Sequence, residues 1–215
     1  MRATITVTLA AALLGWGTLA EAHEVWLERD GAGPVRVYLG EPAEPVPAGG
    51  DPEFAKLKAP VVFTTDRSAP AVLTRKTDHL EVAVTGDGDV RATDDSVFAP
   101  WGEDDAKEAA VFHARAGRTE TRTVLDLEIA PVTPEGDTFA VTYEGSPLAD
   151  ASVTLINPDR WSKSFKTDAA GRLTIPTTWD GRYLLAVSHT VESPARVGEH
   201  EVAKIHHIAT LTFVD

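Results

Sequence analysis

The sequence predicts an all-β protein built from two β-sandwich-like units. Three observations support this class. After residue 22, no stretch repeats apolar residues at helical spacing, many short segments alternate apolar and polar side chains, and turn-forming residues separate those segments at short intervals. Beyond residue 137, about six or seven strands fit into about 80 residues, which is typical of an antiparallel sandwich. We therefore expect the C-terminal unit to be immunoglobulin-like or transthyretin-like.

The N-terminal unit is expected to span residues 23–132. The alternating pattern predicts strands over residues 25–28, 35–39, 80–84, 111–115 and 124–129. The Pro and Gly residues of segment 42–50 predict a loop, and segment 52–58 fits one short helix. Residues 86–106 are rich in Gly and Asp, but they lack the Gly and terminal Glu positions of a calcium-binding EF-hand loop. We interpret them as a solvated acidic loop.

A linker over residues 131–137 leads into the C-terminal unit, residues 133–215. Segment 167–171 (TDAAG) predicts a hairpin turn, in which Asp168 caps the turn and Gly171 takes a positive φ angle. The alternating pattern predicts the following strands around this turn: residues 139–143, 153–155, 173–175, 183–189 and 203–213.

Residues 1–22 have the features of a secretory signal peptide. Arg2 precedes a short apolar run, and Ala20-Glu21-Ala22 fits the small-x-small rule for cleavage. The run of about 17 residues is at the short edge for a membrane span. We expect cleavage after Ala22, no stable membrane anchor afterwards, and a periplasmic location.

The composition excludes several classes of function. The formal net charge of −13 argues against a nucleic-acid partner and against docking on anionic lipids. The absence of cysteine excludes disulfides, thiolate metal sites and thiol nucleophiles. No Ser/His/Asp motif, phosphate loop or HExxH motif is present, so we do not expect an enzyme. Seven histidines are available as metal ligands.

His23 is the strongest candidate for a metal ligand. Cleavage after Ala22 makes it the first residue of the mature chain, so that its α-amine and ring Nδ1 can chelate one ion. The ordinary pKa of an α-amine is about 7.7–8.0, so a metal can displace its proton. A second histidine then completes a histidine brace, a set of three nitrogens that suits Cu(II) or Ni(II). A cleavage site that differs by one residue would destroy this arrangement.

Four further histidines are candidate ligands. If segments 183–189 and 203–213 form an antiparallel hairpin, His189 and His207 point to the same side of the sheet near one end of the sandwich. His206 points to the other side. His113 alternates with apolar residues in the N-terminal unit and could lie close to them. Each of the four could equally be an ordinary hydrogen-bonded histidine.

The chain resembles a periplasmic domain-of-unknown-function family, whose members are often described as nickel/cobalt uptake components. The segment Ala22-His23-Glu24-Val25-Trp26-Leu27-Glu28 is similar to the Ala-His-Glu/Asp-Phe-Trp-Leu-Glu start of that family. Further similar segments are residues 127–131, 136–139, 145–149, 167–172, 181–185 and 209–213. The resemblance implies a secreted, two-part β protein that binds a transition metal for uptake. We expect the metal to be Ni, Co or Cu and the protein to deliver it to a membrane metal transporter. His23 matches the family motif, His189 lies at a similar position, and His206-His207 is a local peculiarity.

Two other functions stay open at this stage. A metal-free binding or interaction module would fit the sandwich-like C-terminal unit. A histidine-brace copper oxidase acting on polysaccharide would use the same His23. Such an oxidase needs an open face around copper, to which Trp101, Trp161 and Trp179 could contribute.

Overall fold

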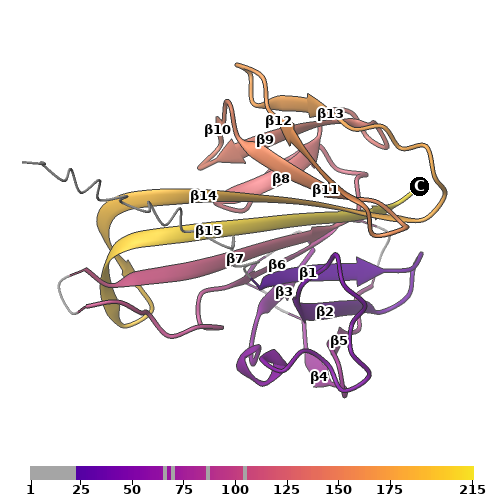
Figure 1. Ribbon diagram of the computed structural model, residues 1–215. Coiled ribbons are helices and arrows are strands. Elements are labelled where there is room, and N and C mark those ends of the chain that lie inside the picture. Colours follow the sequence, from indigo (N-terminus) through magenta and orange to yellow (C-terminus); the bar gives the residue numbers. More distant parts are fainter. Residues whose placement is uncertain (1–22, 65–66, 69–70, 86–87, 104–105) are drawn as a thin grey trace, which may run out of the picture.

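The computed structural model describes residues 23–64, 67–68, 71–85, 88–103 and 106–215 (Figure 1). The predicted signal peptide, residues 1–22, lies outside the described residues. None of the helices in the described part is long and apolar enough to cross a membrane. One short 3₁₀ helix, η1 (Phe54–Lys56), lies within the segment predicted to be helical.

The strands of the described residues form three sheets. The first sheet has the order β1 (Glu24–Arg29), β2 (Val35–Gly40), β5 (Leu80–Val82), β4 (Leu73–Arg75). The second sheet, which we call the shared sheet, has the order β12 (Ser162–Lys166), β11 (Ser152–Ile156), β14 (Arg182–Val197), β15 (His200–Val214), β7 (Glu108–Ala116), β6 (Val90–Asp94), β3 (Val61–Phe63). The third sheet has the order β10 (Ser146–Pro147), β9 (Thr138–Tyr143), β13 (Arg172–Thr174), and β8 (Leu127–Pro131) also pairs with β9.

The shared sheet lies between the other two sheets. In Figure 1 the first sheet lies below β7 and β15, and the third sheet lies above β14 and β15. One hydrophobic core packs between the first sheet and the shared sheet and draws its buried residues from positions 25–116. A second core draws its buried residues from positions 127–213 and packs on the other face of the shared sheet. The prediction of an all-β protein with sandwich-like units is confirmed.

The shared sheet crosses the boundary expected between residues 132 and 133. Strand β15 from the C-terminal part pairs in parallel with β7 from the N-terminal part, with His207 opposite Val111 and Ala209 opposite His113. The two cores draw their buried residues from separate stretches of the sequence, whereas the shared sheet between them contains strands from both.

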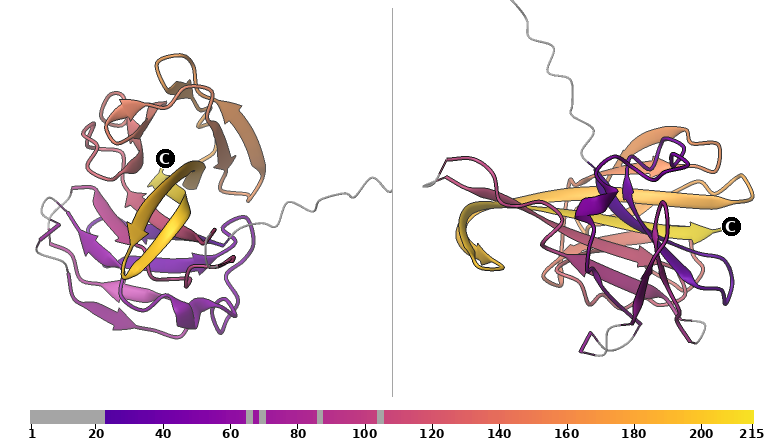
Figure 2. Two further views of the ribbon diagram at one scale, coloured as in Figure 1. Left: turned by 90° about the vertical axis from the view of Figure 1, so that its left-hand side faces the viewer. Right: turned by 90° about the horizontal axis from the view of Figure 1, so that it is seen from below.

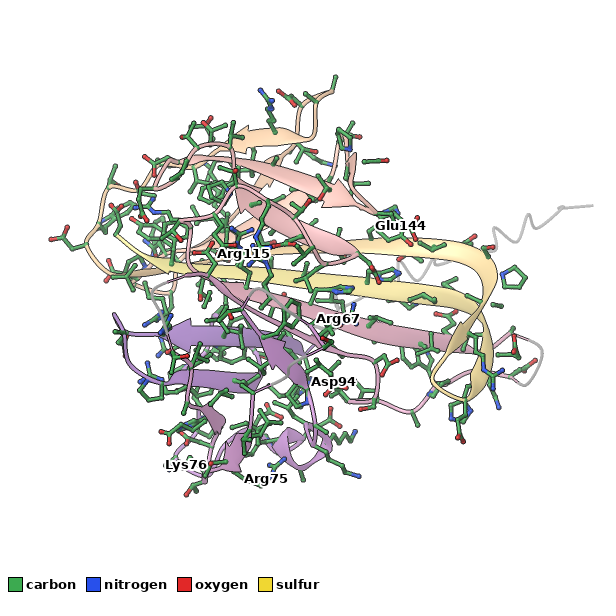
Figure 3. The ribbon with its side chains drawn as sticks, turned by 180° about the vertical axis from the view of Figure 1, so that it is seen from behind. Arg67, Arg75, Lys76, Asp94, Arg115 and Glu144 are labelled. Atoms are coloured by element: carbon green, nitrogen blue, oxygen red, sulfur yellow. The ribbon has the colours of Figure 1, made fainter. Side chains whose placement is uncertain are left out.

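Strand β6 was not predicted from the alternating pattern, although all five of its residues are buried. The reason is that it carries charged side chains inward. Arg91 and Arg115, on neighbouring strands, are both fully buried. Both donate to the same carboxylate oxygen, Glu128 Oε1, at 2.9 and 2.8 Å, and Arg115 also donates to Asp89 Oδ2 at 2.5 Å. This network, which includes the Arg115 labelled in Figure 3, links the shared sheet to strand β8 beside the third sheet.

Strands β14 and β15 form a long antiparallel hairpin. It extends beyond the two smaller sheets and curls at its tip (Figure 2). Its register shifts between Glu192 and Ala195, which marks a β-bulge and accounts for the bend. Val197 and Val202 pack against Ala109 of β7 in a small core near this tip.

Candidate metal-binding site

A cavity of about 560 Å³ opens on the face of the shared sheet that also carries the first sheet. Its polar wall includes two imidazoles and one carboxylate, those of His23, His206 and Glu108. Its apolar wall includes the rings of Phe98, Trp101 and Phe112. The cavity thus brings together two of the five predicted ligands, one near each end of the described residues.

His23 immediately precedes β1, and its side chain is 26% exposed. Its Nε2 lies 3.1 Å from Asp51 Oδ1, and its ring stands edge-on to Phe98. Asp51 is held in place because its Oδ1 also accepts the backbone N–H of Glu53 at 2.7 Å. An imidazole that donates Nε2–H to a carboxylate presents the lone pair of Nδ1 for other bonds.

His206 is held in a similar way on β15. Its Nε2 lies 2.6 Å from Glu108 Oε2, its Nδ1 lies 3.2 Å from the Thr190 hydroxyl, and its ring stacks on Trp101. The hydrogen bond from His206, followed by that from Lys204, holds the pKa of Glu108 below its ordinary value. Both imidazoles of the cavity therefore have a carboxylate at Nε2.

The other three predicted ligands lie on the opposite face of the shared sheet. His189 and His207 are direct cross-strand neighbours in the β14–β15 hairpin, which confirms that they point to the same side. His113 of β7 stacks on His207, with His113 Nε2 at 3.1 Å from His207 Nδ1. The ring of Tyr143 covers this group, with its centroid 4.6 Å from that of His189 and 5.1 Å from that of His207.

Burial lowers the pKa of two members of this second group, His113 and His207. His113 is 2% exposed, and its buried Nδ1 has no hydrogen-bond partner among the described residues. Burial, followed by the neighbouring His207, lowers the pKa of His113 from 6.5 to about 3. Burial also lowers the pKa of His207, although Asp126 acts in the opposite direction. Both rings are therefore neutral near pH 7.

The five predicted ligands thus form two groups rather than one. His23 and His206 line the cavity on one face, whereas His113, His189 and His207 lie together on the other. Within the described part of the chain, no three His, Asp or Glu side chains are placed so that they could hold one metal ion. A metal site in this cavity consequently needs a further donor besides its two imidazoles.

Sequence reasoning did not identify Asp51, Glu108, Thr190 and Tyr143. Asp51 lies 28 positions from His23, and Glu108 lies 98 positions from His206. No local pattern links such distant positions, because the contacts depend on how the strands pair. The one available signal was the register of the β14–β15 hairpin, which places Thr190 opposite His206.

The three tryptophans considered for an open aromatic face do not lie together. Trp101 bridges to Glu108, which is level with Lys204 of β15. Trp179 precedes Arg182, which pairs with Val214 at the far end of β15. The part of β15 from Lys204 to Val214 spans roughly 30 Å, so Trp101 and Trp179 lie near opposite ends of this strand. Trp161 also lies at that far end, because it follows the turn at Asn157 after β11.

Residues 20–191 match the family model of the domain of unknown function DUF4198. The chain belongs to the DUF4198 family. The predicted family resemblance is thereby confirmed, whereas a role in nickel or cobalt uptake stays a prediction. The DUF4198 match includes His23, His113 and His189 but ends before β15, which carries His206 and His207. No curated protein and no solved structure matches the chain.

Proposed function

We propose that this DUF4198 protein is a periplasmic binding protein for a divalent transition metal, Ni(II), Co(II) or Cu(II). The metal is its cargo, which it binds and delivers to a membrane transporter. The ligands are the α-amine and Nδ1 of His23, as the first residue of the mature chain, together with the imidazole of His206.

One observation carries this proposal. His23 and His206 line the same cavity, and each has its Nε2 against a carboxylate, Asp51 for His23 and Glu108 for His206. Metal-ligating histidines almost always donate their other ring N–H to such an acceptor, which fixes the tautomer and raises the basicity of the ligating nitrogen. In both rings the nitrogen left for a metal is then Nδ1.

His206 must exchange one hydrogen bond to bind an ion. Its bond to the neutral Thr190 hydroxyl, at 3.2 Å, is longer than its bond to Glu108, at 2.6 Å. Bonds to ionised groups are the stronger ones. We therefore expect Nδ1 to leave Thr190 and bind the metal while Glu108 keeps Nε2. The two imidazoles and the amine make three nitrogen donors, a set that favours Cu(II) and Ni(II).

The net charge of −13 agrees with a cationic cargo. A negative surface raises the local concentration of cations, although only within a Debye length of about 8–10 Å at physiological salt.

Calorimetric titration of Ni(II) and Cu(II) into protein that begins at His23 tests this proposal. We expect one-to-one binding that weakens at least about tenfold when one extra Ala precedes His23, because the chelating amine is then displaced while the ring stays. His206→Ala should weaken binding similarly. His200→Ala, at the exposed first residue of β15, is the matched control and should leave affinity unchanged.

Equal and weak binding by all four proteins would contradict the proposal. It would favour a metal-free binding module instead. Tight binding that survives the extra Ala but not His206→Ala would refute the role of the amine.

A further inference from the structure

The cavity that holds His23 and His206 is much larger than a metal ion requires. It measures about 560 Å³, within the range of about 300–1,000 Å³ that is typical of sites for small organic molecules. A single ion takes up a volume on the order of one water molecule, about 30 Å³ in the liquid. The cavity therefore has room for a second component beside the ion.

The surface of this cavity is mainly apolar. Its apolar side chains come from β7, from β15 and from the segment between β6 and β7, and they are Ala110, Phe112, Ile208, Phe98 and Trp101. Water molecules on a divalent ion donate strong hydrogen bonds, and a wall of this kind offers them few acceptors. An organic molecule with an apolar body fits such a wall better than water does.

An aromatic side chain flanks each of the two proposed imidazole ligands. The Phe98 ring stands edge-on to His23 with the centroids 6.3 Å apart, and the Trp101 ring stacks on His206 with the centroids 5.7 Å apart. Phe112 extends this wall, because its ring centroid lies 6.0 Å from that of Phe98. A flat ring bound to the same ion would lie among these groups, and aromatic pairs at such distances are favourable beyond the area that they bury.

The proposed protein ligands leave part of the coordination sphere open. The α-amine and the two imidazoles are three neutral nitrogens, whereas Cu(II) and Ni(II) favour tetragonal geometries with at least four donors. Asp51 and Glu108 already lie against Nε2 of His23 and His206. Within the described part of the chain, no three His, Asp or Glu side chains are placed to hold one ion. A further donor from outside the chain can complete the sphere, and an anionic oxygen would also reduce the charge of the ion in an apolar cavity.

We propose that the cargo of this protein is a divalent metal held by a small aromatic chelator, which supplies one nitrogen and one carboxylate oxygen. The two donor atoms of the chelator replace water on the ion, and its ring packs against Phe98 and Trp101. This inference rests on the proposed function, because the metal of that site holds the chelator.

Equilibrium dialysis tests this inference with pyridine-2-carboxylate (picolinate) as the aromatic chelator and glycine as the control. Both bind a metal through one nitrogen and one carboxylate oxygen, but glycine has no ring. Protein that begins at His23 is dialysed over a range of concentrations against Ni(II) alone, against each chelator alone, and against equimolar Ni(II) with each chelator. We expect picolinate to be retained with Ni(II) and not without it. Its nickel complex should bind at least about tenfold more tightly than the glycine complex.

The three arms separate this inference from the proposed function. Nickel that is retained alone, with picolinate bound no more tightly than glycine, would refute the aromatic chelator and leave the metal function intact. Picolinate that is retained equally without nickel would refute the role of the metal in holding it. Nickel that is retained neither alone nor with a chelator would refute both.

Two variants locate the chelator within the cavity. The measured quantity is the affinity for the nickel–picolinate complex divided by that for the nickel–glycine complex, because a general loss of metal affinity affects both complexes alike. Trp101→Ala, at an exposed side chain, and Phe98→Ala should each lower this ratio at least about threefold. Trp161→Ala, at an exposed tryptophan outside the cavity, should leave it unchanged. A ratio that stays at the wild-type value in both Trp101→Ala and Phe98→Ala would overturn the assignment to this cavity.

Discussion

Acidification should destabilise the protein through His113. This side chain is 2% exposed, and burial together with the adjacent His207 lowers its pKa from 6.5 to about 3. The unfolded chain takes up a proton at this position below pH 6.5, whereas the folded chain does not until near pH 3. The free energy of unfolding therefore falls as the pH falls through this window.

The size of the effect follows from the shift. One pKa unit corresponds to about 1.4 kcal/mol, so the shift of His113 is worth about 5 kcal/mol once the pH is below both pKa values. Between pH 7 and pH 5 the expected loss is about 2 kcal/mol. His207 acts with the same sign because burial lowers its pKa as well.

Urea unfolding at pH 7 and pH 5 measures this difference. We compare wild type with His113→Gln, which cannot titrate, and with His200→Gln, an exposed control. The loss of stability on acidification should be about 2 kcal/mol smaller in His113→Gln than in the other two proteins. If the three losses agree within about 0.5 kcal/mol, His113 is not the neutral, buried group that the reasoning requires.

Three further changes test other parts of the structure. Glu128→Gln should lower the free energy of unfolding by about 3–5 kcal/mol in a urea titration, because it leaves two fully buried arginines without their common carboxylate. A loss below about 1 kcal/mol would mean that the ion pairs of Glu128 with Arg91 and Arg115 are dispensable. Gly117→Ala should lower the melting temperature, because Gly117 has a φ of +107° and a Cβ there would lie 2.4 Å from Asp89 Oδ1; an unchanged melting temperature would contradict that geometry. Asp51→Asn should weaken Ni(II) or Cu(II) binding by about 10–100-fold in calorimetry, because the carboxylate orients the His23 ring without contacting the metal, and should leave the urea unfolding curve unchanged. Full affinity in this variant would show that Asp51 is not part of the metal site.

Local alternation was a good guide to the long strands of this protein. It predicted β1, β2, β9 and β11, and it placed His189 and His207 on one side of the β14–β15 hairpin. It failed for β3 and β4, although β5 and β13, which are also three residues long, were predicted. It also failed for β6, where Arg91 and Asp94 are buried although their residue types usually face solvent.

The sequence by itself therefore determined the all-β class and the residue types available for metal binding. It also predicted the Asp168 cap and the positive φ of Gly171 in the turn at 167–171, but this turn is not a hairpin, because the strands beside it, β12 and β13, lie in different sheets. These predictions depend on side-chain alternation and turn chemistry, which act over a few neighbouring residues. Only the tertiary structure decided that His23 and His206 share a cavity and that His113 lies against His207 on the opposite face. The physical reason is that both contacts join distant segments of the chain. The first depends on how β1 packs against β15 and the second on the parallel pairing of β7 with β15, and neither follows from a local pattern.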